Sequence, residues 1–277
     1  MNDRDCTALL QWALPRLELR WPGFRKVRGQ VCKRIQLRMR DLGIEGFAAY
    51  RERLETDAQE WRAFDECCHI TISRFFRDKG VFEALRRLVL PEIANRAERE
   101  RRETRCWSAG CASGEEPYTV RILWNLDIAR KFPGIDMSII ATDIDRAMLE
   151  RAREGCYERT SLRELPPGLV AEAFDTVDNR LCVRPRHRQR VTFLSQDLRS
   201  QVPTGPFDLV LCRNVAFTYF AEPLQRLILT RIQEELLPGG YLIIGVHEHL
   251  PEAAAFVALP DKPQILRRRA ASDLEAT

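Results

Sequence analysis

The chain has 277 residues, of which 45% are hydrophobic and 30% charged, the composition of an ordinary globular protein. This length suffices for one large domain and a smaller one, and no apolar run approaches the ~20 residues that a membrane span requires. The N-terminus is polar rather than a signal peptide, so we expect a cytoplasmic protein without membrane insertion. Nine cysteines without C-x-x-C spacing, among them Cys106, Cys182 and Cys212, are expected to be buried thiols rather than zinc ligands or disulfides.

Residues 1–68 are predicted to form an all-α domain. Apolar residues recur at near-helical spacing from Val27 to Leu42, and Gly43 interrupts the pattern. A second stripe that includes aromatic residues runs from Phe47 to Trp61 and is expected to be core.

The net charge of +4 conceals a local excess of basic residues. Residues 16–40 contain nine lysines and arginines but only one acid, Glu18. Two interpretations are open: a solvated helix face, or a surface that attracts an acidic protein or nucleic acid. Nucleic acid is the less favoured partner, because aromatic residues do not alternate with the charges as in a single-strand binder. The basic residues are Arg16, Arg20, Arg25, Lys26, Arg28, Lys33, Arg34, Arg38 and Arg40.

Residues 69–277 are predicted to form a second, α/β domain. It begins with a helical stretch over 69–103, and from residue 104 strands alternate with helices, as in a parallel sheet covered on both faces. Phe174–Val183 is predicted to be a small hairpin turning at Asp178-Asn179, and Pro238-Gly-Gly240 a turn. We expect strands at 105–108, 138–142, 191–194, 207–212, 240–245 and near 263–268, and helices at 115–130, 145–154 and 222–236.

The first predicted strand leads into a turn of small residues, Gly110–Gly114, which lets the backbone approach a ligand. Glu115 follows where a phosphate site would present bare N–H groups or a lysine. A carboxylate there repels phosphate but suits a ribose hydroxyl, an ammonium or a sulfonium. The pattern favours S-adenosylmethionine, although a tight strand–helix connection would use the same small residues.

Polar residues also follow the next three predicted strands. Asp143 could accept both ribose hydroxyls, since Asp145 is better placed to cap the following helix. Asp197 could accept from an adenine amino group or only close a turn. Asn214 offers an acceptor and two donors near a ligand, or is a satisfied turn amide. The histidines of His247-Glu-His249 have no third ligand in view, so no metal site is expected.

Six motifs, in order, resemble those of CheR-type chemotaxis receptor methyltransferases, over roughly 20–268. The resemblance implies a class I S-adenosylmethionine-dependent methyltransferase fold: a Rossmann-like, mostly parallel sheet, an N-terminal all-α substrate-recognition domain and a small β-hairpin insertion. It also implies methyl transfer from S-adenosylmethionine to glutamates in an acidic helical region of a receptor, with S-adenosylhomocysteine as product. The motifs are Ile70-Thr-Ile-Ser-Arg-Phe-Phe-Arg-Asp78, Trp107-Ser-Ala-Gly-Cys-Ala-Ser-Gly-Glu-Glu-Pro-Tyr118, Ala141-Thr-Asp-Ile-Asp145, Ser161-Leu-Arg-Glu-Leu-Pro166, Cys212-Arg-Asn-Val215 with Tyr219-Phe220, and Pro238-Gly-Gly240.

The resemblance implies two catalytic residues. A glutamate side chain, with a pKa near ~4.3, is already an anion at neutral pH, so its methylation needs no general base. Arg77 would bind the acceptor carboxylate, unless it forms an ion pair with Asp78 or another acid. Tyr219 would orient that carboxylate or contact the sulfonium, unless it packs in the core. The implied donor-binding residues are Thr71, Ser73, Arg77, Gly110, Glu115, Asp143, Asp197, Leu198, Asn214 and Val215.

Four departures from the family pattern keep other functions open. Thr71 stands where many members have Asn, Asp197 replaces Asn, and one extra residue separates Val215 from Tyr219. The 174–190 hairpin lacks the Gly-rich loop of members that dock a receptor's C-terminal pentapeptide, so no such tether is expected. The alternatives are transfer to a small molecule or RNA, and a donor-binding, non-catalytic signalling module.

Overall fold

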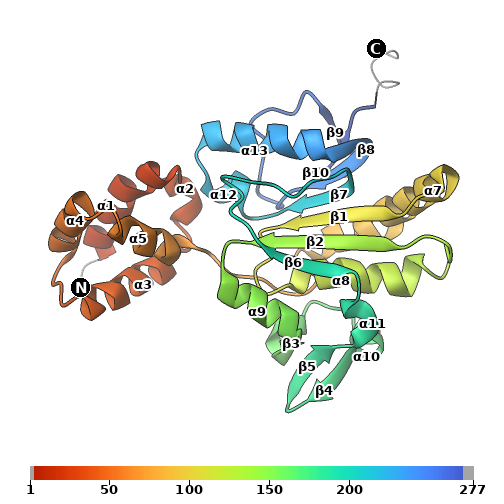
Figure 1. The fold of residues 1–277 in the computed structure, drawn as a ribbon, viewed down its shortest axis with the longest axis horizontal. Helices are drawn as coiled ribbons and strands as arrows, with labels where there is room; N and C mark the ends of the chain where they lie inside the picture. The colour runs from red at the N-terminus through yellow and green to blue at the C-terminus, as the bar shows by residue number, and fades with distance from the viewer. Residues whose placement is uncertain (1–2, 271–277) are drawn as a thin grey trace. The chain divides into compact units, whose positions relative to one another are not determined.

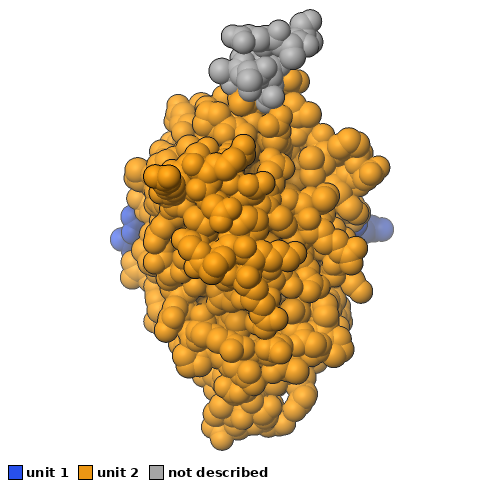
Figure 2. Space-filling view, turned by 90° about the vertical axis from the view of Figure 1, so that its right-hand side faces the viewer, with its two compact units in different colours: residues 1–70, 218–225 blue, residues 71–217, 226–277 orange. Residues whose placement is uncertain are grey.

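The computed structural model describes residues 3–270, which form two compact units (Figures 1 and 2). Unit 1 comprises the residues up to Ile70 together with Thr218–Gln225. Unit 2 comprises Thr71–Phe217 and the described residues from Arg226 onward. The division differs from the predicted ranges 1–68 and 69–277 chiefly in Thr218–Gln225, which groups with the N-terminal helices.

Unit 1 is built of short helices around a core that includes Val31, Ile35, Tyr50 and Phe64. The predicted apolar stripe forms the buried side of the third helix, so the all-α architecture is confirmed. The segment after residue 217 joins this unit through its backbone, because Ala221 N–H donates to the Glu18 carbonyl at 2.7 Å. The helices are α1 (Asp3–Ala13), the 3-10 helix η1 (Leu14–Leu17), α2 (Trp21–Phe24), α3 (Arg28–Asp41), α4 (Phe47–Thr56) and α5 (Glu60–Cys68).

Unit 2 contains a seven-stranded sheet in the order β6-β2-β1-β7-β8-β10-β9. Neighbouring strands from β6 through β8 are parallel, whereas β10 is antiparallel to both of its neighbours. The predicted mostly parallel sheet is thus confirmed, although the prediction omitted β9. The strands are β1 (Thr104–Ala109), β2 (Met137–Asp143), β6 (Val191–Ser195), β7 (Phe207–Cys212), β8 (Leu236–Ile243), β9 (Phe256–Leu259) and β10 (Lys262–Arg268).

Strand β8 begins earlier than predicted, and Pro238-Gly-Gly240 lies within it rather than in a turn before it. Leu236 pairs with Phe207 of β7, and pairing resumes at Tyr241 opposite Leu209. The register shift lets the Pro-Gly-Gly segment bulge out of the ladder while the strand continues on both sides. A bulge and a turn use the same residues, so composition alone could not distinguish them.

The helices of unit 2 precede the sheet or connect its strands, and α8 and α9 pack against β2 and β6. Asp145 caps α9 as predicted, since its carboxylate accepts from Met148 N–H at 3.1 Å. Two of the helices contain a π-helical turn. The elements are α6 (Lys79–Ala84), η2 (Leu85–Val89), α7 (Leu90–Glu100), α8 (Glu115–Leu123), η3 (Trp124–Ile128) and α9 (Arg146–Glu154), followed by α12 (Ala216–Tyr219) and α13 (Glu222–Glu235), parts of which belong to unit 1.

A separate three-stranded sheet, in the order β3-β5-β4, extends from unit 2 (Figure 1). The predicted hairpin and its turn are confirmed, because Asp178 and Asn179 both have positive φ, at 47° and 63°. The sequence analysis missed β3. The elements are β3 (Cys156–Tyr157), η4 (Arg159–Leu162), α10 (Pro167–Ala173), β4 (Phe174–Val177), β5 (Arg180–Val183) and α11 (Pro185–Arg188).

The cysteines correct one prediction. Cys6 is disulfide-bonded to Cys32 in unit 1, and Cys156 to Cys182 across β3 and β5. The expectation of thiols without disulfides was therefore wrong, because helix packing and strand register bring together cysteines 26 residues apart. Cys106 and Cys212 are fully buried free thiols, as expected, and burial raises their pKa.

Candidate functional site

Four neighbouring parallel strands bring the predicted site residues to one edge of the sheet. Gly110 follows β1, Asp143 ends β2, Asp197 follows β6 and Asn214 follows β7. The strand order reverses direction between β1 and β7, where open α/β sheets form a ligand crevice.

The turn after β1 is fastened to β2. Gly110 N–H and Cys111 N–H both donate to the Thr142 carbonyl, at 2.8 and 3.0 Å. Gly110 has φ +70°, and a Cβ there would lie 3.1 Å from the Val215 side chain. Glycine is therefore required for both the backbone conformation and the close approach of the segment after β7.

Asp143 is anchored by backbone donors on both of its oxygens. Oδ2 accepts from Ala112 N–H at 2.8 Å, and Oδ1 accepts from Asp145 N–H at 2.9 Å. Each carboxylate oxygen has more than one acceptor direction, so both can also accept from the hydroxyls of a ribose. The side chain is half-buried at the edge of the sheet, as a ligand contact requires.

Glu115 lies in the first turn of α8 and is only 3% exposed. Ser113 Oγ lies 2.9 Å from both carboxylate oxygens, and Ser73 also hydrogen-bonds to the carboxylate. Burial raises the pKa of this carboxyl group. Within residues 3–270 its direct partners are hydroxyl and backbone groups rather than a cation, which suits a ligand that brings its own positive charge.

Glu248, the residue between His247 and His249, is a buried acid that the sequence analysis missed. Glu248 Oε2 accepts from Asn214 N–H at 2.9 Å and from Gly245 N–H at 2.5 Å, joining the ends of β7 and β8. His247 and His249 are exposed. Among residues 3–270 no cluster of three or more His, Cys, Asp or Glu could hold a metal ion. The only local signal for this contact was an acid a few residues after the end of β8 at Ile243.

Two models of known protein families match two successive parts of this chain. Residues 71–263 match the model described as the CheR methyltransferase, SAM binding domain, and residues 26–66 match the CheR methyltransferase, all-alpha domain. The chain belongs to the CheR methyltransferase family. It is 35% identical over 234 residues to a probable chemotaxis protein methyltransferase of Rhizobium etli, covering 82% of this chain and 86% of that protein. It is 35% identical over 231 residues to the chemotaxis protein methyltransferase of Salmonella typhimurium, covering 80% and 76%.

S-adenosylmethionine fits the edge described above. Asp143 is a half-buried carboxylate with its backbone contacts already made, and the hydrogen bonds recorded for the buried Glu115 come from hydroxyl and backbone groups. The turn from Gly110 to Gly114 depends on its two terminal glycines, because both have positive φ and a Cβ at either would crowd the protein's own side chains. The cofactor prediction therefore agrees with both the family and the geometry.

Asp197, which replaces the family's Asn, is already paired in the CheR-type domain. Arg199 Nε lies 3.0 Å from both carboxylate oxygens, and Arg199 N–H donates to Oδ1 at 2.9 Å. The carboxylate is thus fixed by its own turn and has acceptor capacity left for one more donor. Asp197 and the half-buried Leu198 as adenine contacts stay predictions.

The segment before α6 carries Thr71, Ser73 and Arg77, all half-buried. Arg77 Nη1 donates to the Ile72 carbonyl at 2.7 Å, within its own segment. The alternative ion pair with Asp78 does not form, because Asp78 binds Arg213 at 2.7 Å. The role of Arg77 toward an acceptor stays a prediction.

Tyr219, the second predicted catalytic residue, belongs to unit 1. It is half-buried, and its ring packs edge-on against Phe24 with centroids 5.1 Å apart. Its backbone carbonyl accepts from Arg20 N–H at 2.8 Å. The core-packing alternative thus describes part of what this side chain does, and its catalytic role stays a prediction.

The basic residues of the all-alpha domain fall into two groups. Arg38 makes a bidentate ion pair with Glu60, which is 2% exposed and also accepts from Tyr50 Oη at 2.7 Å. This pairing lowers the pKa of the Glu60 carboxyl despite its burial. Arg34 binds the Cys67 and His69 carbonyls. The basic run is therefore partly neutralised by contacts within the domain, and its exposed members include Arg25, Lys26, Lys33 and Arg40.

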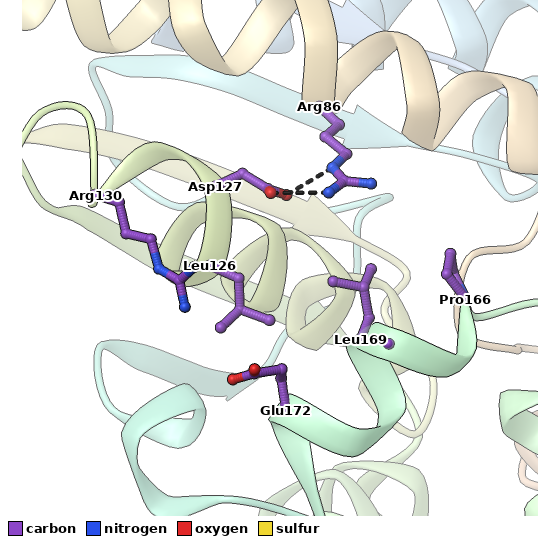
Figure 3. A pocket seen from close by; sticks show the side chains of 8 residues that line it. Arg86, Leu126, Asp127, Arg130, Pro166, Leu169 and Glu172 are labelled. Atoms are coloured by element: carbon purple, nitrogen blue, oxygen red, sulfur yellow. Dashed lines mark hydrogen bonds and ion pairs between the residues drawn. The ribbon is translucent and has the colours of Figure 1, made fainter.

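Unit 2 also has a hollow of about 340 Å³ that involves none of the predicted site residues (Figure 3). Arg86 crosses one side of it in a bidentate ion pair with Asp127, at 2.7 and 2.9 Å. With positive and negative groups lining it together, the hollow has no single charge preference. Its lining residues are Arg86, Leu126, Asp127, Arg130, Pro166, Gly168, Leu169 and Glu172.

Proposed function

We propose that this protein transfers the methyl group of S-adenosylmethionine to glutamate side chains of a chemoreceptor, giving glutamate methyl esters. The observation that carries the proposal is the pair of anchored carboxylates, Asp143 and Glu115, beside the small-residue turn of a CheR-family sheet. Relatives named chemotaxis protein methyltransferase support the choice of a receptor as acceptor.

Methyl transfer to a carboxylate requires no proton transfer by the protein's side chains. When bound, S-adenosylmethionine supplies a methyl group on a positively charged sulfur, and the acceptor carboxylate is an anion at neutral pH. The side chains must therefore place two partners in line and keep water away from the carboxylate. Asp143 and Glu115 would hold the ribose and a positive group of the donor, and Arg77 would orient the acceptor carboxylate.

The acceptor surface we propose is an acidic helical region of the receptor. The exposed basic residues of the all-alpha domain, such as Lys33 and Arg40 on α3, give an attraction of the right sign. Nucleic acid remains the less favoured partner, and no pentapeptide tether is proposed for the β4–β5 hairpin, whose turn is only Asp178-Asn179. Within residues 3–270 no helix is both long and apolar enough to cross a membrane. A cytoplasmic location belongs to the proposal.

The test is a methyl-transfer assay with radiolabelled donor and the signalling fragment of a receptor from the same organism. We expect label on the receptor that is released by base, as for an ester, and that is lost with Asp143→Ala. Base-stable label on RNA would favour the nucleic-acid alternative, and release of labelled product with a small-molecule acceptor would favour the other transferase. Donor binding without transfer to any acceptor would favour the non-catalytic module.

A further inference from the structure

Arg77 lies in a strained stretch of backbone. The residues on either side of it, Phe76 and Asp78, have φ of +59° and +65°. Side chains larger than glycine rarely adopt this left-handed region, and such residues persist only where the surroundings hold them. The position of Arg77 therefore depends on contacts that fix its neighbours.

The residues before Arg77 are held by burial and by their backbone. Phe75 and Phe76 are fully buried, and Phe76 stacks on Phe82 with centroids 5.4 Å apart. Phe75 N–H donates to the Ser161 carbonyl at 3.0 Å, and Phe76 N–H donates to Thr119 Oγ1 at 3.3 Å. These contacts fix the chain only up to the residue before the arginine.

On the other half of the segment, Val81 N–H donates to the Asp78 carbonyl at 2.7 Å, and Arg213 supplies the contacts from a distant part of the chain. Arg213 Nη2 donates to the Arg77 carbonyl at 2.8 Å and to Asp78 Oδ2 at 2.7 Å. Nη1 of the same guanidinium donates to Glu116 Oε2 at 2.9 Å. The Arg213 side chain is 2% exposed and lies over the Phe82 ring, so the guanidinium itself is buried, whereas its partner Asp78 is 32% exposed.

Arg213 also connects this segment to the donor edge. It directly follows β7 and precedes Asn214, and its partner Glu116 is the residue after Glu115 in the first turn of α8. Glu116 is itself fixed, because its Oε1 accepts from Ser108 Oγ of β1 at 2.8 Å. The Arg213 guanidinium therefore connects the Arg77 backbone to two elements of the predicted donor site. These are the end of β7, which carries Arg213, and the start of α8, which carries Glu116.

We propose that Arg213 is a positioning residue: it holds the strained backbone at Arg77 so that the Arg77 guanidinium meets the acceptor carboxylate, and it contacts neither donor nor acceptor. The proposal rests on the proposed function, in which Arg77 orients that carboxylate. Only an arginine suits the role, because a planar fork reaches three acceptors in two directions, whereas the ammonium of a lysine is a single point donor.

The test compares Arg213→Lys with a matched control, Arg121→Lys. Arg121 is also a buried arginine, with a carboxylate partner, Asp136, and a carbonyl partner, Met137, but these lie at the start of β2. Without donor or acceptor, Arg213→Lys should raise hydrogen–deuterium exchange of the 71–78 amides about tenfold. Arg121→Lys should lower thermal stability comparably and leave exchange at 71–78 unchanged.

Kinetics then separate positioning from stability. Arg213→Lys should lower kcat about 30-fold with donor Kd nearly unchanged, because small misplacements of an orienting group are costly to the rate. In an Arg77→Ala background the same substitution should cost less than about threefold, since the group it places is gone. If Arg213→Lys does not fold, Asp78→Asn, which keeps the Arg77 carbonyl contact, should raise exchange at 71–78 by a smaller factor.

Two results would overturn the proposal. Unchanged exchange at 71–78 in the folded variant would remove the positioning role, whatever the acceptor. Multiplicative losses of kcat in the Arg77→Ala, Arg213→Lys pair would show that Arg213 acts independently of Arg77. A wild-type protein that methylates no receptor would instead refute the proposed function, while the exchange result would still stand by itself.

Discussion

Asp143→Ala should weaken methyl-donor binding by about two orders of magnitude. In the structure each oxygen of Asp143 already accepts one backbone N–H, from Ala112 and from Asp145, at 2.8 and 2.9 Å. The carboxylate is thus oriented before the donor arrives, and little ordering is left for binding. Two ribose hydroxyls bonded to a charged acceptor contribute about 1.5 kcal/mol each at the low end, suited to a half-buried side chain. Their sum, about 3 kcal/mol, corresponds to roughly a 100-fold change in Kd.

Isothermal titration calorimetry with S-adenosylmethionine, and with S-adenosylhomocysteine, measures this effect directly. Asp143→Asn keeps one acceptor oxygen but loses the charge, so we expect an intermediate loss of about tenfold. The matched control is Asp145→Ala, two residues away, whose carboxylate caps α9 through Met148 N–H. Loss of that cap should lower stability by about 1 kcal/mol and leave donor affinity nearly unchanged.

The reasoning fails if Asp143→Ala, folded and as stable as the Asp145→Ala control, binds the donor within about threefold of wild type. Equal losses in both variants would point instead to general disruption of the edge between β2 and α9. Only a large loss confined to Asp143 supports the ribose contact.

Three further results are expected. Arg77→Ala should reduce kcat by about 100-fold, equivalent to about 3 kcal/mol, and change donor Kd much less; near-normal turnover would remove it from the catalytic residues. Reversing exposed Lys33 and Arg40 to Glu should raise KM for the receptor and reduce its salt sensitivity without changing donor binding, and an unchanged KM would identify a merely solvated face. Burial, and then the charge of a neighbouring arginine, lowers the pKa of His187 from 6.5 to about 4, so the folded state resists its protonation. Stability present above pH 6.5 is then lost as the pH falls toward 4, and chemical denaturation of His187→Gln should show a flatter profile in that window; identical profiles would contradict this assignment.

Local patterns in the sequence were enough for most of the secondary structure of unit 2. The parallel strands, the Asp145 cap and the Asp178-Asn179 turn depend on residues that are neighbours in the chain, so their signals are readable without the fold. The order of strands and loops also placed Gly110 and Asp143 at strand ends, and parallel pairing then carries them to a common edge.

Contacts between distant residues could not be predicted in this way. Nothing near Arg38 in the sequence identifies Glu60 as its buried partner, and the basic run gave no sign of which charges would be neutralised. The disulfide between Cys156 and Cys182 depends on the register of β3 against β5, which no spacing rule supplies. The early start of β8 likewise depends on its pairing with β7.

The hold on Arg77 is the clearest case of what only the tertiary structure decided. The sequence by itself singled out Arg77 through its motif, and Arg213 stood in another motif more than a hundred residues later without an assigned role. The strained backbone around Arg77 and the buried Arg213 guanidinium that binds it can be recognised only in the folded structure, where the two motifs are in contact. Local sequence specifies which groups are available, whereas burial and long-range hydrogen bonds decide which of them are fixed in place, because both depend on chain segments that meet only in the folded state.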